Sequence, residues 1–221
     1  MKPIDIALAV AVAVIWGVGF VATRIAVDEM SATLLTALRF GITALPCVFL
    51  PRPKLSWGLI IAISWLLVAQ FLAQTYGLAH GVPAGLTAVI VQSQALFTVA
   101  FAAIFLSELP TRIQVIGIAI SMCGLLLICF TVGYDFSVWA FAVLMTAPIS
   151  FAVSNLMLRR AQEVSMLDLF AWIGLLAMLP LLTILLTVEG AAATWQALTH
   201  ISLLAASCVL ALALLGTTLG Y

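Results

Sequence analysis

The chain has 221 residues, of which 66% are hydrophobic and 7% are charged, against about 25% charged residues in an ordinary soluble domain. A soluble fold of this size could not cover its surface with so few polar side chains, and the sequence holds neither a basic stripe for nucleic acid nor a polar tract typical of disorder. The eight basic and eight acidic residues separate apolar runs of about 20 residues, the length that a helix needs to cross a bilayer. The composition therefore predicts an all-α, polytopic membrane helix bundle.

Eight membrane spans are predicted in chain order, joined by short connections that hold the turn signals and most of the charges. The predicted spans are residues 4–23, 32–50, 57–79, 84–106, 113–131, 136–158, 167–188 and 201–221. None of the connections is long enough for a soluble domain, so we expect the function to lie inside the bundle or at its two faces.

The basic residues predict the orientation of the bundle, because lysine and arginine in short loops favour the cytoplasmic side. With the N-terminus inside, the inner side receives Lys2, Arg52, Lys54, Arg112, Arg159 and Arg160, whereas the outer side receives Arg24 and Arg39. The sequence therefore predicts a cytoplasmic N-terminus.

Two matched pairs of residues indicate an internal repeat. Trp16 and Arg24 are eight residues apart at the end of the first span, and Phe151 and Arg159 have the same spacing, 135 residues later, at the end of the sixth. Five spans separate the two pairs, and an odd number of helices turns the second copy upside down in the bilayer, as in inverted-topology repeats. The eighth span reaches the last residue without a cap or a flanking charge, so the second repeat is expected to be incomplete. The predicted repeats are residues 1–132, with five helices, and residues 133–221, with three.

Polar and aromatic side chains inside the spans are candidates to line a substrate cavity, because buried polar groups in a membrane need partners and often mark function. The predicted substrate-binding residues are Trp16, Phe20, Gln70, Gln74, Gln94, Thr98, Asn155 and Tyr221. The two glutamines of the third span share one helix face, and Gln94 and Thr98 are one turn apart in the fourth. Hydrogen bonds between helices, worth about 0.6–2 kcal/mol each, are the alternative role, and both roles stay open for Gln74 and Gln94.

Two charged residues are predicted to form a gate or a charge pair. Arg39 lies within the second span, where it could reach outward to the interface, pair with Asp28 or Glu29, or meet an anionic group of the substrate. Glu108 ends the fourth span beside Arg112, which suggests either a helix-end charge pair or a gate residue.

The sequence does not predict a cofactor, a metal site or a catalytic residue. The four cysteines are scattered singly through apolar runs without a C-x-x-C motif, and the two histidines lie near none of them. The sequence contains no H-E-x-x-H motif and no interfacial cluster of aspartate and histidine that could serve a membrane enzyme.

Residues 79–128 contain a distinctive pattern, made up of Ser107-Glu108-Leu109, Gln114, Gly117 and Gly124. Together with Trp16-Gly17-Val18-Gly19-Phe20 and Leu38-Arg39-Phe40, this pattern resembles the EamA family of the drug/metabolite transporter superfamily. Many family members have a proline near the position of Ala95, and its absence, with Gln-Ser-Gln-Ala-Leu-Phe at 92–97 and Pro83-Ala84-Gly85, is similar to the branch named for the O-acetylserine/cysteine exporter.

The resemblance implies a ten-helix inverted repeat in a bacterial inner membrane, of which the last two helices are missing from this chain. It also implies export of small polar metabolites, amino acids or cysteine-pathway intermediates, by alternating access. The expected partners are a small-molecule substrate and the lipid bilayer, without nucleic acid. Gly117, Ser121 and Gly124 share a face of the fifth span that would allow close helix contact within a homodimer.

Two alternative functions remain open at this point. The first is a broad drug or nucleobase exporter on the same fold. The second is a membrane-embedded, lipid-handling enzyme, for which Glu108 is the one plausible catalytic candidate.

Overall fold

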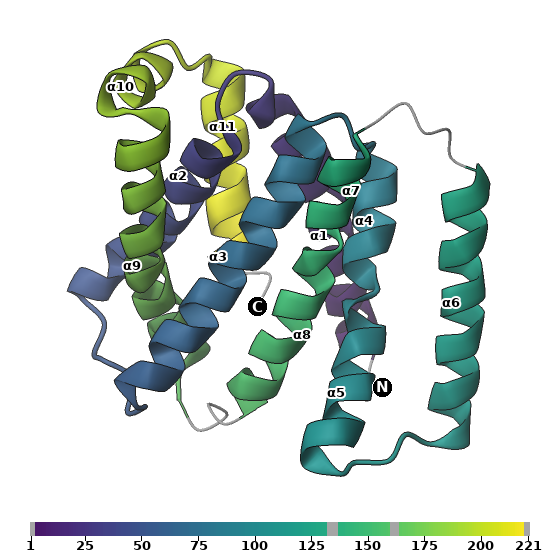
Figure 1. Cartoon of the computed structure of the whole chain (residues 1–221). Coiled ribbons are helices and arrows are strands. Elements are labelled where there is room, and N and C mark those ends of the chain that lie inside the picture. The colour runs from purple at the N-terminus through teal and green to yellow at the C-terminus, as the bar shows by residue number, and fades with distance from the viewer. Residues whose placement is uncertain (1–2, 132–136, 160–163, 219–221) are drawn as a thin grey trace. The chain divides into compact units, whose positions relative to one another are not determined.

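The computed structural model describes residues 3–131, 137–159 and 164–218, and Figure 1 shows them as helices joined by short connections. No strand occurs among these residues, and the predicted all-α, polytopic membrane bundle is confirmed. The contacts form two compact units. Unit 1 consists of Met1–Trp65 and Val164–Tyr221, and unit 2 consists of Leu66–Glu163. The boundary between the two sequence repeats at residue 132 stays a prediction.

Five of the eight predicted spans are helices, or helix pairs, long and apolar enough to cross a membrane. They are α1 (Pro3–Val27), α3 (Trp57–Ala79), α4 with α5 (Ala84–Gln92 and Gln94–Leu106), α7 with α8 (Val138–Leu144 and Thr146–Leu158), and α9 with its π-helical end η3 (Met166–Ile184 and Leu185–Glu189). The second and fifth spans, whose apolar stretches are shorter within the described residues, are α2 with the 3-10 turn η1 (Ala32–Ala44 and Leu45–Val48) and α6 (Arg112–Thr131).

The C-terminal region of the described chain differs from the prediction of one connection followed by one helix. α10 spans Ala191–Thr199, and α11 spans Leu203–Ala211 and continues into the π-helical segment η4 (Leu212–Thr218). The axes of these two parts are bent by 103°. The prediction missed α10 because Gly190, whose φ of +86° suits glycine, resembles a loop signal when only the sequence is read.

Local hydrogen bonds and prolines explain the breaks within the spans. Ser93 separates α4 from α5, and its hydroxyl donates to the Ile90 carbonyl at 2.6 Å while its backbone N–H bonds the same carbonyl at 3.0 Å. Pro148 has no N–H to offer the carbonyl of Leu144, four residues before it, and α7 ends at Leu144. Pro46 similarly converts the end of α2 into a 3-10 turn.

Unit 1 is organised around the crossing of α2 and α9. A Cβ on Gly174 would lie 2.8 Å from the Phe40 carbonyl oxygen and 3.0 Å from the Ala44 nitrogen, so the two backbones touch at this position. Gly41 lies on the same crossing, where a Cβ would be 3.6 Å from the Met178 sulfur. Small residues at helix crossings are typical of membrane bundles because they allow this close approach.

In unit 2, α8 packs along α4 and α5. Gly77 on α3 lies against α7, where an added Cβ would be 3.2 Å from the Leu144 Cβ. The tight turn between α3 and α4 is closed by a 3.0 Å hydrogen bond from the Val82 N–H to the Gly77 carbonyl. α6 is connected through the turn after α5 and exposes most of its surface, including Ile113 at 82%.

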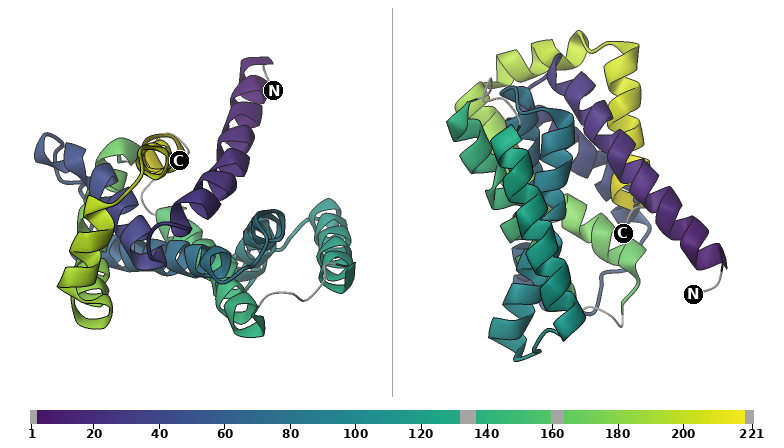
Figure 2. Two further views of the ribbon diagram at one scale, coloured as in Figure 1. Left: turned by 90° about the horizontal axis from the view of Figure 1, so that it is seen from above. Right: turned by 90° about the vertical axis from the view of Figure 1, so that its right-hand side faces the viewer.

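α1 contacts the rest of unit 1 mainly through its C-terminal part. Gly19 lies against Leu212 of η4, with 3.6 Å between its Cβ position and the leucine Cδ2. Figure 2 shows the N-terminal half of α1 extending away from α2 and α11, and Leu8 is 61% exposed there. An exposed apolar surface on this helix suits contact with lipid.

Two serine–carboxylate contacts join the connection between α1 and α2 to distant segments of unit 1. The Ser31 hydroxyl caps α2 by accepting the Leu34 N–H at 3.1 Å, and it donates to the Glu189 carboxylate at 2.6 Å. The Ser202 hydroxyl caps α11 and donates to Glu29 at 2.6 Å, while the Ser202 N–H donates to the same carboxylate at 2.9 Å. The connection between α1 and α2 thus supplies the carboxylate that contacts the cap of α11, and its own Ser31 cap contacts a carboxylate at the end of η3.

The Glu29–Ser202 contact predicts a stability that depends on pH. The hydrogen bond from the Ser202 hydroxyl, followed by that from its N–H, lowers the pKa of Glu29. A lowered pKa in the folded state means that this stabilisation is present above the ordinary carboxyl pKa and is lost as the pH falls through the lowered value. We expect Ser202→Ala, which also removes a helix cap worth about 1 kcal/mol, to lower Tm by about 2–4 °C at neutral pH and by less in acid.

Thermal unfolding of the purified protein at several pH values measures this effect. Ser137→Ala is the matched control, because Ser137 caps α7 in the same way and contacts no carboxylate among the described residues. A Ser202→Ala deficit that stays constant from neutral to acid pH would contradict the role of Glu29.

Candidate functional site

The predicted site residues fall into both compact units. Trp16, Phe20 and Arg39 belong to unit 1. The remaining described residues belong to unit 2, and they are Gln70, Gln74, Gln94, Thr98, Glu108 and Asn155. Tyr221 lies outside the described residues.

The glutamines of unit 2 are buried. Gln70 and Gln74 on α3 are 3% and 6% exposed, and Gln94 at the start of α5 is 9% exposed. Oε1 of Gln70 and Oε1 of Gln94 accept no hydrogen bond in the structure, and the Oγ1 of Thr87 on α4, at 0% exposure, is also without a partner. Thr87 lies seven residues before Gln94 along the chain, and only the structure shows that its hydroxyl is unbonded.

The two other polar candidates of unit 2 are half-buried. The Thr98 hydroxyl donates to the Gln94 carbonyl at 2.8 Å, one helical turn before it. Asn155 lies on α8, which packs against α5. Thr98 and Asn155 therefore lie on two helices, α5 and α8, that pack against each other.

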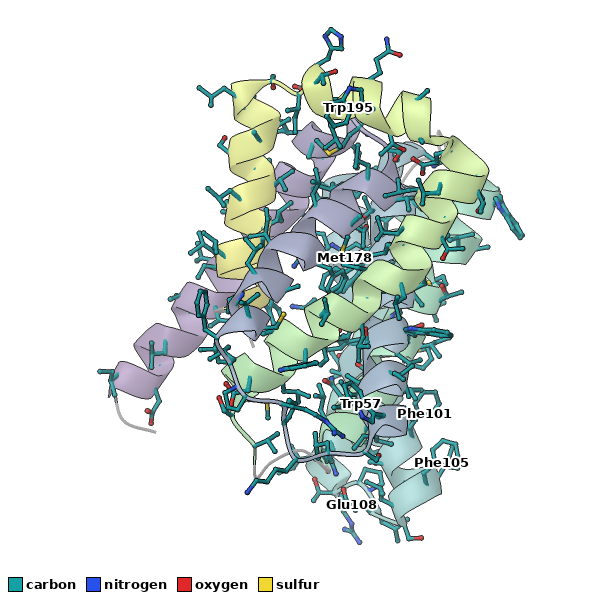
Figure 3. All side chains as sticks on the ribbon, turned by 90° about the vertical axis from the view of Figure 1, so that its left-hand side faces the viewer. Trp57, Phe101, Phe105, Glu108, Met178 and Trp195 are labelled. Atoms are coloured by element: carbon teal, nitrogen blue, oxygen red, sulfur yellow. The ribbon has the colours of Figure 1, made fainter. Side chains whose placement is uncertain are left out.

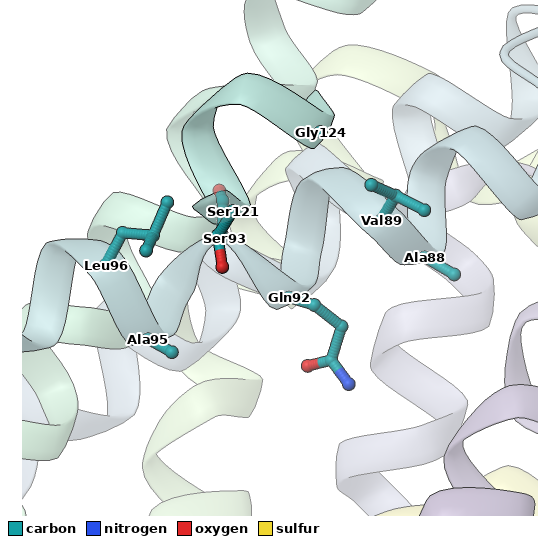
Figure 4. Close-up of a pocket in the computed structure, with 8 residues that line it drawn as sticks. All are labelled: Ala88, Val89, Gln92, Ser93, Ala95, Leu96, Ser121 and Gly124. Atoms are coloured by element: carbon teal, nitrogen blue, oxygen red, sulfur yellow. The ribbon is translucent and has the colours of Figure 1, made fainter. Parts of the chain in front are cut away.

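A cavity of about 420 Å³ lies between the α4–α5 break and α6 (Figure 4). Its lining residues are Ala88, Val89, Gln92, Ser93, Ala95, Leu96, Ser121 and Gly124. None of the predicted substrate-binding residues lines this cavity. Gly117 and Gly124, which were predicted to allow close helix contact, have nothing within 4 Å of an added Cβ.

Arg39 is buried in the middle of α2, at 8% exposure. Its guanidinium lies against Gly216 of η4, where a Cβ would be 3.2 Å from Nη2. The two carboxylates proposed from the sequence as its partners have contacts elsewhere: Asp28 pairs with Arg24 at 3.3 Å, and Glu29 binds Ser202. A guanidinium at this depth is unusual, because charged side chains inside a membrane are rare and generally functional.

On α1, Trp16 and Phe20 are half-buried and one turn apart. Thr23, which is 2% exposed, bonds the Gly19 carbonyl at 2.7 Å. The C-terminal part of α1 that carries these side chains packs against α11 and η4.

Glu108 forms an ion pair with Arg159, with 2.7 Å between Oε2 and Nη1. Ser107 ends α5 in the left-handed region, at φ 56°, and the Glu108 N–H returns to the Ala102 carbonyl at 3.3 Å, which is a typical helix C-cap. Figure 3 shows Phe101, Phe105 and Glu108 following one another to this end of α5. The sequence had suggested Arg112 as the neighbouring charge, because it is close along the chain.

The ion pair predicts a small and salt-sensitive stabilisation. Both side chains are about half exposed, at 43% and 57%, and exposed pairs contribute about 0–1 kcal/mol. We expect Glu108→Arg and Arg159→Glu each to lower Tm slightly, and the double exchange to restore it. A double-mutant cycle at low and high salt measures the coupling, and two independent, additive losses would contradict the pair.

Comparison with known proteins identifies a family and two relatives that match most of the chain. The sequence model of the EamA-like transporter family matches residues 4–130. A Salmonella typhimurium protein named "Probable amino-acid metabolite efflux pump" is 33% identical over 227 residues, which cover 97% of this chain and 74% of that protein. An Escherichia coli protein of the same name is 28% identical over 225 residues, covering 98% of this chain and 75% of its own length.

Proposed function

The chain belongs to the EamA-like transporter family, a family of multi-pass membrane proteins, and on this basis we propose that it exports amino-acid metabolites by alternating access. The observation that carries the proposal is the 33% identity, over 97% of the chain, to the Salmonella typhimurium efflux pump. The proposed location is the bacterial inner membrane, with the N-terminus in the cytoplasm.

The buried polar side chains support transport of a small polar cargo. Amide oxygens without partners cost free energy inside a protein, and a cargo that donates hydrogen bonds would satisfy them. We assign substrate contacts in unit 2 to Gln70, Gln74, Gln94, Thr98 and Asn155. Binding and release of this kind require no covalent step, so the proposal is a transporter and not an enzyme.

In unit 1, the proposed substrate contacts are Trp16 and Phe20, with Tyr221 beyond the described residues. Arg39 is proposed to recognise an anionic group of the cargo, since a guanidinium binds carboxylates through two parallel hydrogen bonds. The Glu108–Arg159 pair is proposed as a gate contact that breaks during the transport cycle. The two sequence repeats and a homodimer through α6 belong to the same proposal.

Export of labelled cysteine and O-acetylserine from cells that express the chain tests this function. Cells with the protein are expected to lose label faster than cells without it, and Gln94→Ala and Asn155→Ala should each slow that loss severalfold. Gln196→Ala on the exposed helix α10 is the control for replacing a glutamine. Unchanged efflux in both site variants, at equal expression, would refute the assigned contacts, and resistance to unrelated drugs without metabolite efflux would favour a broad drug exporter.

A further inference from the structure

The connection that precedes α3 carries two exposed cations, Arg52 and Lys54. Neither of them forms an ion pair with a carboxylate among the described residues. Asp168, in the first turn of the neighbouring helix α9, also forms no ion pair there. The described part of unit 1 therefore leaves both positive charges to a partner from outside the chain.

The Arg52 guanidinium is held in place by an aromatic stack. Its Cζ lies 4.2 Å from the centroid of the Trp57 ring, a cation–π contact, and its Nη2 donates to the Leu55 carbonyl at 3.1 Å. The Trp57 ring in turn meets Trp172 of α9 edge to face, with 5.9 Å between the centroids and 68° between the planes. A guanidinium has five N–H donors, so those that do not bond Leu55 remain for a ligand.

The backbone of this connection is fixed as well. Pro51 and Pro53 restrict its φ angles, Pro53 is buried, and the Leu55 N–H bonds the Pro53 carbonyl at 2.8 Å. The Ser64 hydroxyl of α3 donates to the Ile173 carbonyl at 2.8 Å, which ties α3 to α9. The two cations are therefore presented from a constrained loop at one end of unit 1.

The length of α3 places this end of unit 1 at the membrane surface. The candidate span runs from Trp57 to Ala79, so Trp57, labelled in Figure 3, lies at the interface where tryptophan is enriched, and the preceding loop lies at the level of the headgroups. Val48 and Phe49, just before this loop, are 79% and 88% exposed. One short segment thus offers apolar side chains to acyl chains and cations to headgroups.

We propose that Arg52, Lys54 and Trp57 form a docking site for the phosphate group of an anionic phospholipid. Phosphate oxygens are charged acceptors, which match a guanidinium and an ammonium group, and basic residues beside a span attract anionic lipids. A zwitterionic lipid brings its own cation to the same positive charges, so it fits less well. A lipid is favoured over soluble phosphate because Val48 and Phe49 would contact its chains. The proposal rests on the membrane spans and is independent of the exported cargo.

Thermal unfolding of the purified protein in a neutral detergent tests the site, with short-chain phospholipids added as probes at physiological ionic strength. Dioctanoyl phosphatidylglycerol, which carries one net negative charge, should raise Tm by about 2–4 °C. Dioctanoyl phosphatidylcholine, which has the same chains and no net charge, should raise Tm by less, and inorganic phosphate should leave it unchanged. The three probes separate the anionic headgroup, the acyl chains and the free ion as sources of binding.

Substitutions assign the binding to this connection. Arg52→Gln and Lys54→Gln should each weaken the binding of dioctanoyl phosphatidylglycerol about fivefold. Trp57→Leu keeps both charges but removes the ring that orients Arg52, so it should also weaken binding severalfold. Arg112→Gln at the start of α6 is the matched control and should bind as the wild-type protein does. Arg112 is likewise exposed and forms no ion pair among the described residues, but it lies over no aromatic ring there.

Four results would overturn the proposal. Equal stabilisation by phosphatidylcholine would assign the effect to the acyl chains, and equal stabilisation by inorganic phosphate would assign it to a free ion. An equal loss in Arg112→Gln and Arg52→Gln would show attraction to charge alone, and full binding in Trp57→Leu would remove the aromatic stack from the site. Lys54 forms no hydrogen bond or ion pair among the described residues, so Lys54→Gln tests the site even if a variant of the stack does not fold.

Discussion

Replacing Gly174 with alanine is expected to disrupt unit 1, because the added methyl group meets the closest neighbouring atom of any described glycine. The added Cβ would lie 2.8 Å from the Phe40 carbonyl oxygen and 3.0 Å from the Ala44 nitrogen. Both are backbone atoms, so no side-chain rotation can relieve the overlap, and α2 and α9 would have to separate along their crossing. Overpacking a well-filled interior costs about 1–3 kcal/mol and sometimes more, and we expect this position to reach or exceed the upper value.

Gly41→Ala provides the matched control for this prediction. It adds the same methyl group on the same crossing, but there the Cβ would be 3.6 Å from the Met178 sulfur, an ordinary contact with a flexible side chain. Size-exclusion profiles and Tm in detergent measure the outcome, with Gly174→Ala aggregated or strongly destabilised and Gly41→Ala close to wild type. Equal stability of the two variants would show that α2 and α9 do not touch as described.

Replacing Arg39 with methionine is expected to reduce export of amino-acid metabolites at least tenfold. Arg39 is 8% exposed and its guanidinium lies beside Gly216; methionine keeps much of the apolar stem of the side chain but removes this charged group. Hydrogen bonds to a charged group contribute about 1.5–3 kcal/mol, which corresponds to a loss of roughly tenfold to a hundredfold in binding. Lysine retains the charge without the planar fork, so Arg39→Lys should recover only part of the activity.

Efflux from cells and Tm of the purified variants separate a transport role from a structural one. Arg39→Met should remain folded, with a Tm near that of the wild-type protein, while efflux is lost. Gly216→Ala should cause a smaller loss, because its Cβ, 3.2 Å from Nη2, would displace the guanidinium only slightly. Full efflux in Arg39→Met would remove Arg39 from the substrate contacts, and a large fall in Tm would assign it to folding.

Much of the fold follows from hydrophobicity alone, because a bilayer requires long apolar helices whose backbone groups are satisfied internally. The predicted span 57–79 coincides with α3, and 84–106 coincides with the joined helices α4 and α5. The break at Ser93 was missed, since a hydroxyl that bonds the preceding turn leaves no trace in an apolar pattern. The break before α8 had a readable signal in Pro148, which the hydrophobic run concealed.

The candidate site was less predictable, because partners are set by folding and not by spacing. Residue type and depth selected Gln70 and Gln94, but which of their atoms lack partners depends on the neighbouring helices. For Glu108, proximity along the chain favoured Arg112, whereas the ion pair forms with Arg159, 51 residues away. The same limitation applies to Glu29, whose partner Ser202 is 173 residues distant.

The discontinuity of unit 1 has a consequence for biogenesis. Unit 2 is one uninterrupted segment, whereas unit 1 joins Met1–Trp65 to Val164–Tyr221, so its first helices leave the ribosome long before α9 and α11. During that interval the newly inserted α2 holds a cationic side chain in lipid without the helices that later surround it, a state that membrane insertion tolerates only at a cost. Unit 2 is therefore expected to assemble first, and synthesis of α9 and α11 to complete the bundle.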